Sequence, residues 1–374
     1  MHTSRFRITH LIPQIGIGGA ELQLCRLISL APVQRAVQDV LYYSDSLDQE
    51  GFRVYRDAGL EFVRVERGRI GSPAFLWRLA GEIRRRNPDV LHCWLAGGAL
   101  WGRWGGLLAG VPRIVLSIRS SKVDLAPFLR ISRLADGGRV HYLVNSSAVA
   151  AAVASRVGVP ASRIAVVPNG IDLGGPTTVP SREALLGERG CPAGTRIALT
   201  VGRLTEAKNY PMLLRIAAEC RGRLPLHFFI AGHGEQEGAL RALTTRMGLE
   251  DVVQFLGLRH DVPALLRAAD LFCYTSRYEG FPNAVLEAMA AGCPIVTTNF
   301  IGHEDIVEAG RTALVVAQDD DAGAFDALSR VVNDAAMARA LGSAARREAE
   351  ARFSLELMVD GTLEHYERLM KGAA

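Results

Sequence analysis

The stretch Glu279-Gly-Phe-Pro-Asn-Ala-Val-Leu-Glu287 combines a glycine turn, a proline and two carboxylates that are eight positions apart. Pro282 has no N–H to lose in a first helical turn, so we expect a helix to begin there and to run to Gly292. The positive end of that helix suits an anionic group, while the two glutamates suit neutral hydroxyls as hydrogen-bond acceptors. A phosphate joined to a polyol, as in a nucleotide sugar, fits both. A capped helix with solvated acids is the simpler alternative.

A second segment, Gly202-Arg203-Leu-Thr-Glu-Ala-Lys208-Asn209, follows the apolar run Ile197–Val201. A glycine at the end of a strand allows a sharp turn, and the two cations five residues apart are then able to converge on one anion. Arginine offers a planar fork and lysine a compact charge, a combination suited to a diphosphate leaving group. The alternative is a pair of solvated surface cations.

Together the two segments resemble the retaining nucleotide-sugar glycosyltransferases of the GT-B fold, specifically glycosyltransferase family 4. The resemblance extends over nearly the whole chain. It includes Gly16-Ile-Gly18-Gly19-Ala-Glu21, Val167-Pro-Asn169-Gly170-Ile-Asp172 and Ala231-Gly232-His-Gly234. It implies an α/β fold of two Rossmann-like domains facing a central cleft, and no cofactor beyond the nucleotide-diphosphate sugar donor.

The resemblance also implies roles for individual residues. Arg203 and Lys208 would hold the diphosphate, Glu287 would bind the ribose hydroxyls, and Glu279 would contact the transferred sugar. The backbone at Gly280, Phe281, Pro282 and Asn283 would contact the same sugar, and Arg259 lies in the turn that resembles the base-contacting one, with an ordinary loop residue as the alternative. The turn at Gly18 and Gly19 is able to bring backbone N–H groups to a phosphate, or is a plain strand-to-helix turn.

The reaction implied by the family is transfer with retention through front-face attack, in which positioning and electrostatic stabilisation outweigh acid–base chemistry. Many relatives carry a histidine at the end of the fifth strand, where this chain has Arg119. Arginine is not a base at neutral pH, so Arg119 is a candidate for binding acceptor phosphate or for capping a strand. His92 is another catalytic candidate, with a structural histidine as the alternative. For Asp319-Asp320-Asp321 helix capping is a simpler interpretation than metal binding, and we expect no metal site.

Apolar runs alternate with helical patterns along the whole sequence, which predicts parallel sheets built from βαβ units. The domains are expected at 1–172, for the acceptor, and 195–353, for the nucleotide-sugar donor. A Gly/Pro-rich linker is expected at 173–194 and a final helix at 354–374 that crosses back to the N-terminal domain. Strands are expected at 6–12, 37–43, 62–65, 90–93, 113–118, 142–145, 164–167, 196–201, 227–231, 252–255, 271–274, 294–297 and 313–316.

Charge is distributed unevenly between the two halves. Residues 1–180 hold 22 basic and 13 acidic side chains, a net charge of +9, while the remainder carries −5. This basic half is a candidate surface for a membrane or an anionic acceptor, whereas no motif for nucleic acid accompanies it. The basic and aromatic residues that we assign to this face are Arg84, Arg85, Arg86, Arg103, Arg113, Arg119, Lys122, Arg130, Arg133, Trp94, Trp101 and Trp104.

The remaining composition is that of a globular protein, with 49% hydrophobic and 22% charged residues. The six cysteines lack paired spacing and are expected to be reduced core thiols. With no signal peptide or membrane span in the sequence, we expect a cytoplasmic protein, at the inner face of the membrane if the basic half binds it. The expected function is transfer from a UDP- or GDP-sugar to a glycan or lipid-linked acceptor in envelope synthesis. The alternatives are a nucleotide-sugar epimerase, a non-catalytic sugar- or lipid-binding protein and, more distantly, a Rossmann oxidoreductase.

Overall fold

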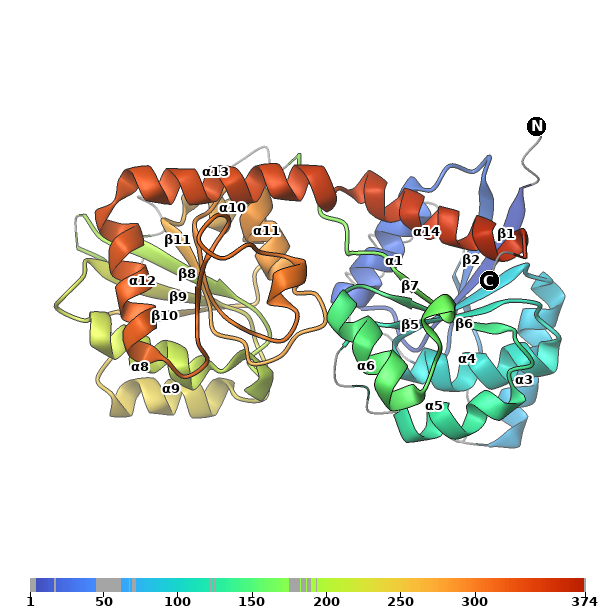
Figure 1. Cartoon of the computed structure of the whole chain (residues 1–374). Helices are drawn as coiled ribbons and strands as arrows, with labels where there is room; N and C mark the ends of the chain where they lie inside the picture. The colour runs from blue at the N-terminus through green and yellow to red at the C-terminus, as the bar shows by residue number, and fades with distance from the viewer. Residues whose placement is uncertain are drawn as a thin grey trace. The chain divides into compact units, whose positions relative to one another are not determined.

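The computed structural model describes residues 5–16, 18–44, 62–66, 68, 72–120, 123, 126–174, 182, 186, 190–192 and 194–372. The chain forms two compact units (Figure 1). The N-terminal unit holds residues 1–170 and 355–374, and the C-terminal unit holds residues 171–354. Each unit has its own parallel sheet and its own core.

The N-terminal unit contains a seven-stranded parallel sheet in the order β3-β2-β1-β4-β5-β6-β7. Its strands are β1 Phe6–Ile12, β2 Ala36–Tyr42, β3 Phe62–Arg64, β4 Val90–Trp94, β5 Ile114–Ile118, β6 Val140–Val144 and β7 Ile164–Val166. Its helices are α1 Gly19–Leu30, α3 Pro73–Arg86, α4 Leu95–Ala109, α5 Ala126–Ser132, α6 Ser147–Val157 and α14 Leu355–Met370, with the short turns η1 Arg133–Ala135 and η2 Ala161–Arg163.

Helices cover both faces of this sheet, which explains why its central strands are buried along their whole length. Apolar side chains of α3, α4, α5 and α6 form one core cluster with the sheet. A second cluster joins the opposite face to α1 and α14, and α14 packs against α1 (Figure 1). The final helix is therefore part of the N-terminal unit.

The C-terminal unit contains a six-stranded parallel sheet in the order β10-β9-β8-β11-β12-β13. Its strands are β8 Arg196–Val201, β9 Leu226–Ala231, β10 Val253–Gly257, β11 Leu271–Tyr274, β12 Ile295–Thr298 and β13 Leu314–Val316. Its helices are α8 Tyr210–Cys220, α9 Glu237–Arg246, α10 Val262–Ala268, α11 Asn283–Ala291, α12 Asp321–Asn333 and α13 Ala335–Arg352, with short turns η3 Glu206–Lys208 and η4 His303–Asp305. Two parallel Rossmann-like sheets are thus confirmed.

Helix α11 begins one residue later than expected. Pro282 is its N-cap, with φ −73° and ψ 113°, and the carbonyl of Pro282 accepts from the N–H of Val285 at 3.2 Å. Proline suits this position because it has no N–H to leave without a partner. The helix ends where expected, since Gly292 takes the left-handed conformation at φ 68° that glycine adopts without strain.

The expected linker, 173–194, lies largely outside the described residues. Arg182, which is described, forms an ion pair with Asp270 at 2.6 Å, and Leu173 packs on the core of the C-terminal unit. The described residues of this segment therefore belong to that unit. No helix among the described residues is long and apolar enough to span a membrane.

Candidate functional site

The two segments singled out in the sequence follow neighbouring strands of the C-terminal sheet. Strand order reverses between β8 and β11, which pair in parallel. Gly202–Asn209 leaves the carboxyl end of β8, and Thr275–Glu279 leaves the carboxyl end of β11. In open parallel sheets the ligand crevice lies at this reversal, outside the carboxyl ends of the strands.

Hydrogen bonds hold the two segments side by side. The Thr275 hydroxyl donates to the Lys208 carbonyl at 3.0 Å, and the Arg277 N–H donates to the Ala207 carbonyl at 2.8 Å. From the other side, the Thr298 hydroxyl on β12 donates to the Ser276 carbonyl at 2.6 Å. These bonds fix the backbone on which the charged side chains stand.

Lys208 and Glu279 form the centre of the site, 71 positions apart in sequence. The Lys208 ammonium donates to Glu279 Oε1 at 2.6 Å and to the Tyr274 hydroxyl at 2.5 Å. The same Glu279 oxygen accepts from the Tyr274 hydroxyl at 2.8 Å and from the Ser276 hydroxyl at 2.6 Å. We call these four residues the Lys208 cluster. Its polar atoms are held by charge-assisted hydrogen bonds in a mostly buried place.

Tyr274 experiences the charges of both glutamates that the sequence singled out. Burial, followed by the charge of Glu279, raises the pKa of Tyr274 well above its usual value, and the charge of Glu287 on α11 acts in the same direction. Both carboxylates therefore act on one buried phenol. The structure brings Lys208 and Glu279 into contact, and the charge of Glu287 reaches the same phenol.

Arg203 differs from Lys208 in having no charged partner among the described residues. Its side chain is exposed, and it makes no hydrogen bond or ion pair with any residue that the structure describes. Its loop is supported from β9, because the N–H of Leu204 donates to the His233 carbonyl at 2.9 Å. A guanidinium on a fixed backbone with no protein acceptor is suited to an incoming anion.

The glycines after β9 are explained by this support. A Cβ on Gly232, whose φ is 151°, would lie 1.9 Å from the Gly202 carbonyl oxygen, and one on Gly234 would lie 2.5 Å from the Leu204 carbonyl oxygen. Only glycine permits so close an approach of two backbones. Gly232 and Gly234 thus shape the Arg203 loop.

Arg259 is engaged within its own turn after β10. Its guanidinium donates to both oxygens of Asp261, at 2.8 and 2.6 Å. This pairing favours the alternative of a loop residue over a guanidinium held ready for the base.

The acidic triplet before α12 is also committed. Asp320 caps α12 by accepting from the Gly323 N–H at 2.9 Å, as expected. Asp319 and Asp321 both accept from Arg215, at 3.1 and 2.6 Å. Carboxylates already neutralised by a guanidinium do not form a cation cage, so the donor set does not fit a metal ion.

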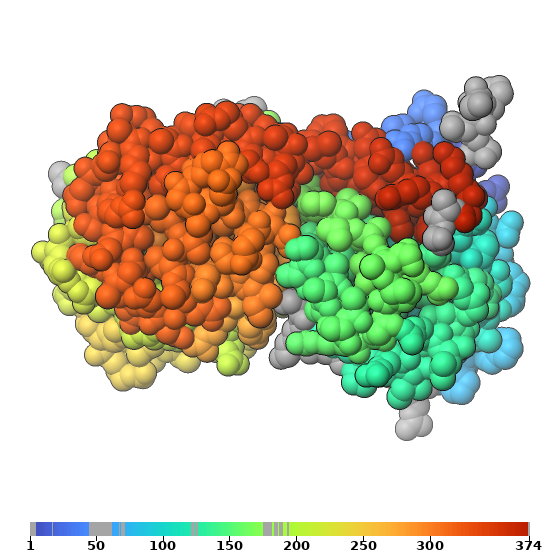
Figure 2. All heavy atoms as spheres, viewed as in Figure 1, coloured from blue at the N-terminus to red at the C-terminus, as the bar shows by residue number. Residues whose placement is uncertain are grey.

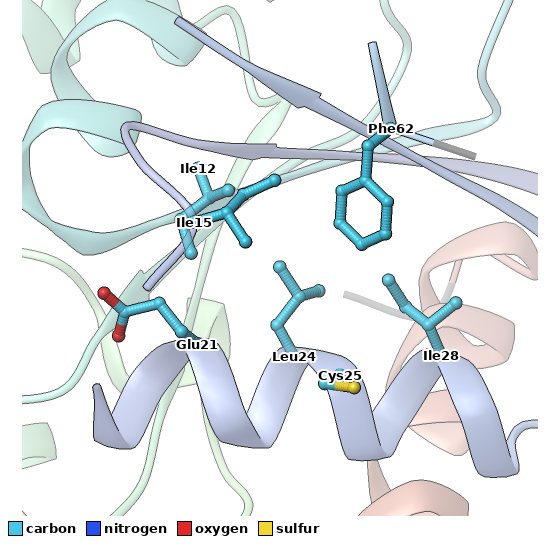
Figure 3. Close-up of a pocket in the computed structure, with 7 residues that line it drawn as sticks. All are labelled: Ile12, Ile15, Glu21, Leu24, Cys25, Ile28 and Phe62. Carbon is cyan, nitrogen blue, oxygen red and sulfur yellow. The ribbon is translucent and has the colours of Figure 1, made fainter. Parts of the chain in front are cut away.

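In the N-terminal unit, the turn at Gly18 and Gly19 carries a carboxylate of its own. A Cβ on Gly18 would lie 2.1 Å from Glu21 Oε2, so the glycine makes room for the Glu21 side chain at the start of α1. Glu21 and the apolar side of α1 face Ile12, Ile15 and Phe62 around a cavity of about 10 Å³ (Figure 3). That volume holds at most about one water molecule. A phosphate bound by the backbone of this turn, as predicted, would therefore lie close to the Glu21 carboxylate or displace it.

Arg119 follows β5, at the carboxyl edge of the N-terminal sheet. Its guanidinium donates to Asn169 Oδ1 at 2.6 Å and lies 5.0 Å from the centre of the Trp94 ring. Burial lowers the pKa of Arg119 to about 10, so it stays a cation at neutral pH. Arg119 is therefore not a base.

His92 is enclosed in the core rather than at this edge. It has no exposed surface, and its two ring nitrogens bond the Tyr366 hydroxyl at 2.6 Å and the Ser117 hydroxyl at 2.9 Å. Burial, and then the charges of neighbouring groups, lower the pKa of His92 well below its usual value. The expectation of a catalytic His92 is corrected: a fully enclosed ring with both nitrogens engaged is structural.

Two residues of the Lys208 cluster, Tyr274 and Ser276, were missed in the sequence. Tyr274 ends an apolar strand and reads as a core aromatic. Ser276 precedes Glu279, the start of the acidic segment, by three positions, and its sequence context suggests a turn residue. The available signal was their position at the carboxyl end of β11, shortly before Glu279.

Solved structures share this architecture. A crystal structure of Anabaena Alr3699/HepE in complex with UDP and glucose superposes with a TM-score of 0.85 at 22% identity, over 97% of this chain and 100% of that one. At that identity the similarity establishes the fold, which is GT-B.

Sequence comparison identifies the family. The model for glycosyl transferases group 1 matches residues 181–348, and the model for glycosyltransferase family 4 matches residues 17–174. The D-inositol 3-phosphate glycosyltransferase of Pseudarthrobacter chlorophenolicus is 31% identical over 72% of this chain and 69% of its own length. The 2-deoxystreptamine N-acetyl-D-glucosaminyltransferase of Streptomyces fradiae is 27% identical over 96% and 92%. The lipopolysaccharide core biosynthesis glycosyltransferase LpsE of Rhizobium meliloti is 28% identical over 46% of this chain and only half its own length. Matches to both halves of the chain, with a relative of this identity and coverage, mean that the chain belongs to glycosyltransferase family 4, a family of retaining hexosyltransferases.

Proposed function

We propose that the protein transfers a hexosyl group, with retention of configuration, from a UDP- or GDP-sugar to a hydroxyl of a glycan or lipid-linked acceptor in envelope synthesis. The observation that carries the proposal is the Lys208 cluster at the β8/β11 reversal, beside the exposed Arg203. An anion with attached hydroxyls fits this set better than a neutral ligand does. The UDP complex of the HepE structure supports a nucleotide donor.

In this proposal the two cations act on the departing diphosphate. Arg203 offers a planar fork that no described residue occupies, and Lys208 offers a fixed charge 2.6 Å from Glu279. Positive charge placed before the reaction stabilises the negative charge that develops on the leaving oxygen, and it does so without reorganising. Glu279 and Glu287 are assigned to sugar and ribose hydroxyls, and the start of α11 adds the positive end of a helix.

The chemistry that we propose is front-face attack without a metal ion. In a retaining double displacement a free carboxylate attacks the anomeric carbon. Oε1 of Glu279 instead accepts three hydrogen bonds, from Lys208, Tyr274 and Ser276. Those three donors withdraw electron density from the Glu279 carboxylate, so it is better suited to orienting a sugar hydroxyl than to attacking the anomeric carbon.

The acceptor proposal rests on the basic N-terminal unit. The name of LpsE places that relative in lipopolysaccharide core synthesis, whereas the Pseudarthrobacter and Streptomyces relatives are named for small polar acceptors. We favour a membrane-bound acceptor because the N-terminal half carries a net charge of +9. Arg119, cationic and held by Asn169, is assigned to an acidic group of that acceptor.

The test is nucleotide release by the purified chain from a panel of UDP-, GDP- and ADP-sugars, with calorimetric binding of the free nucleotide. Arg203→Ala and Lys208→Ala are expected to abolish binding, while Arg221→Ala, which removes an exposed arginine paired with Asp251, is expected to leave it intact. Wild-type binding in both site variants would refute the assignment. Release of an isomerised free sugar would favour an epimerase instead.

A further inference from the structure

The two most exposed large aliphatic side chains described in the protein lie three residues apart. Leu134 is 91% exposed and Ile131 is 74% exposed. Ile131 lies in α5 and Leu134 in the η1 turn that follows it, and α5 lies on the surface of the N-terminal unit (Figures 1 and 2). An exposed aliphatic residue alone is ordinary, whereas two that neighbour each other with a charged rim mark an interaction surface.

Arginines form that rim. Arg130 and Arg133 flank the two aliphatic residues and are exposed. The charges of Arg133 and Arg163 both act on the Asp136 carboxyl, which indicates that the two arginines lie in the same region. None of these three arginines makes an ion pair with a described residue. We call Ile131, Leu134 and these three arginines the α5 patch.

Negative charge is scarce around the patch. Between residues 90 and 171 the sequence has nine basic residues and only two acidic ones, Asp124 and Asp136. Asp136 is buried and bonded to Arg103, which is itself wholly buried. The α5 patch is therefore cationic with no exposed carboxylate among its described residues.

The same burial corrects the membrane face expected from the sequence. Arg103 is a core residue and Trp94 is 1% exposed, so neither lies on a surface. Trp101 and Trp104 are half-buried, packing their rings against Phe75 and Phe128. Lys122 lies outside the described residues. Of the residues assigned to that face, Arg84, Arg85, Arg130 and Arg133 are exposed, and the last two belong to the α5 patch.

We propose that the α5 patch docks the protein on an anionic lipid bilayer, with Ile131 and Leu134 entering the interface and the arginines contacting lipid phosphates. The purpose of this docking rests on the proposed function, since it would bring the enzyme to a membrane-bound acceptor. Aliphatic side chains inserted beside guanidinium groups are the combination that binds anionic membranes at their surface. A second copy of the chain is a poor occupant, because its own patch would bring like charges together. Nucleic acid leaves the two aliphatic residues without a partner.

The first measurement is sedimentation of the full chain with vesicles of phosphatidylcholine, with or without phosphatidylglycerol. We expect binding only to the anionic vesicles, weakened by salt. Ile131→Ser with Leu134→Ser is expected to weaken binding by about tenfold for each residue. Arg130→Gln with Arg133→Gln is expected to weaken it by roughly fivefold for each charge.

Matched controls separate this surface from general effects. Val33→Ser with Leu357→Ser removes two exposed aliphatic residues elsewhere on the N-terminal unit, and Arg346→Gln with Arg347→Gln removes two exposed charges on α13. Both controls are expected to bind vesicles as the wild type does. Wild-type binding by both α5 variants, or absence of wild-type binding to anionic vesicles, would overturn the proposal. So would a wild-type dimer, seen by analytical ultracentrifugation without vesicles, that the Ile131/Leu134 variant dissolves.

Hydrolysis of the donor sugar in vesicle-free buffer distinguishes this proposal from the proposed function. The α5 variants should hydrolyse the donor at the wild-type rate, which also shows that they are folded. If the α5 variants lose vesicle binding but keep donor hydrolysis, the docking proposal is supported. If the wild type binds vesicles but hydrolyses no donor sugar, the proposed function is refuted and the docking proposal is not.

Discussion

Removing the Tyr274 hydroxyl tests whether the four residues of the Lys208 cluster act together on the donor. In Tyr274→Phe the ring keeps its buried place, but the hydroxyl that bonds Lys208 at 2.5 Å and Glu279 at 2.8 Å is lost. Hydrogen bonds to charged groups contribute about 1.5–3 kcal/mol each. Two such bonds are lost, but Glu279 keeps Ser276 and Lys208 as donors and Lys208 keeps Glu279 as acceptor, so no charge loses all its partners. We therefore take the net loss as the low end for a single bond, about 1.5 kcal/mol. That corresponds to roughly a tenfold fall in kcat/KM for the donor.

The assay is steady-state donor turnover together with calorimetric UDP binding. Tyr366→Phe is the matched control: its hydroxyl is equally buried and bonds neutral His92 at 2.6 Å, so we expect lower stability and unchanged UDP affinity. If Tyr274 acts through the lysine, its effect should disappear when Lys208→Gln is already present. Unaltered UDP affinity and turnover in Tyr274→Phe would refute the reasoning, as would effects that add fully in the double variant.

Two further predictions concern stability. Burial lowers the pKa of His10 and His365 to about 4, whereas the pKa of histidine in the unfolded chain is about 6.5. Between these two values the unfolded chain binds protons that the folded chain does not, so the free energy of unfolding decreases as the pH falls. At pH 5 the decrease is about 2 kcal/mol for each of the two histidines. Thermal unfolding followed from neutral to mildly acid pH measures this, and a flat profile would contradict it. Gly232→Ala should lower stability by about 1–3 kcal/mol and weaken UDP binding, because its Cβ meets the Gly202 carbonyl at 1.9 Å. Gly238→Ala, which meets nothing within 4 Å, is the control for both measurements, and equal behaviour of the two variants would count against the close approach.

The fold was predictable because its signals are local. Continuous apolar runs such as Leu271–Tyr274 can be buried on both faces only in a parallel sheet, and helix ends such as Gly292 follow from backbone conformation. Strand alternation therefore predicted both sheets to within a residue or two at most boundaries. The start of α11 was wrong by one residue, since proline is compatible with both the N-cap and the first turn.

The side-chain partners were beyond the sequence because they are not local. The Lys208–Glu279 pair joins residues 71 positions apart, and whether a given lysine stays solvated or meets a carboxylate depends on strand order. Counting charge also treats every arginine as exposed, which is why Arg103, bonded to Asp136 in the core, was assigned to a surface. A histidine at a strand end, such as His92, has the same pattern whether it faces solvent or the core.

If the Lys208 cluster binds a diphosphate, as we propose, a carboxylate within it is unfavourable by itself, since like charges repel. The structure resolves this through Lys208, whose ammonium lies 2.6 Å from Glu279 and whose position the Tyr274 hydroxyl fixes. With Lys208 and Glu279 neutralising each other, the charge that a diphosphate meets first is that of Arg203. When the glycosidic bond lengthens and the leaving oxygen becomes more negative, a fixed ammonium gains attraction without moving, whereas a mobile one would first have to be ordered. In the proposed mechanism Glu279, by fixing Lys208, would stabilise the transition state more than the ground state, and in this way a pair of opposite charges would contribute to transfer.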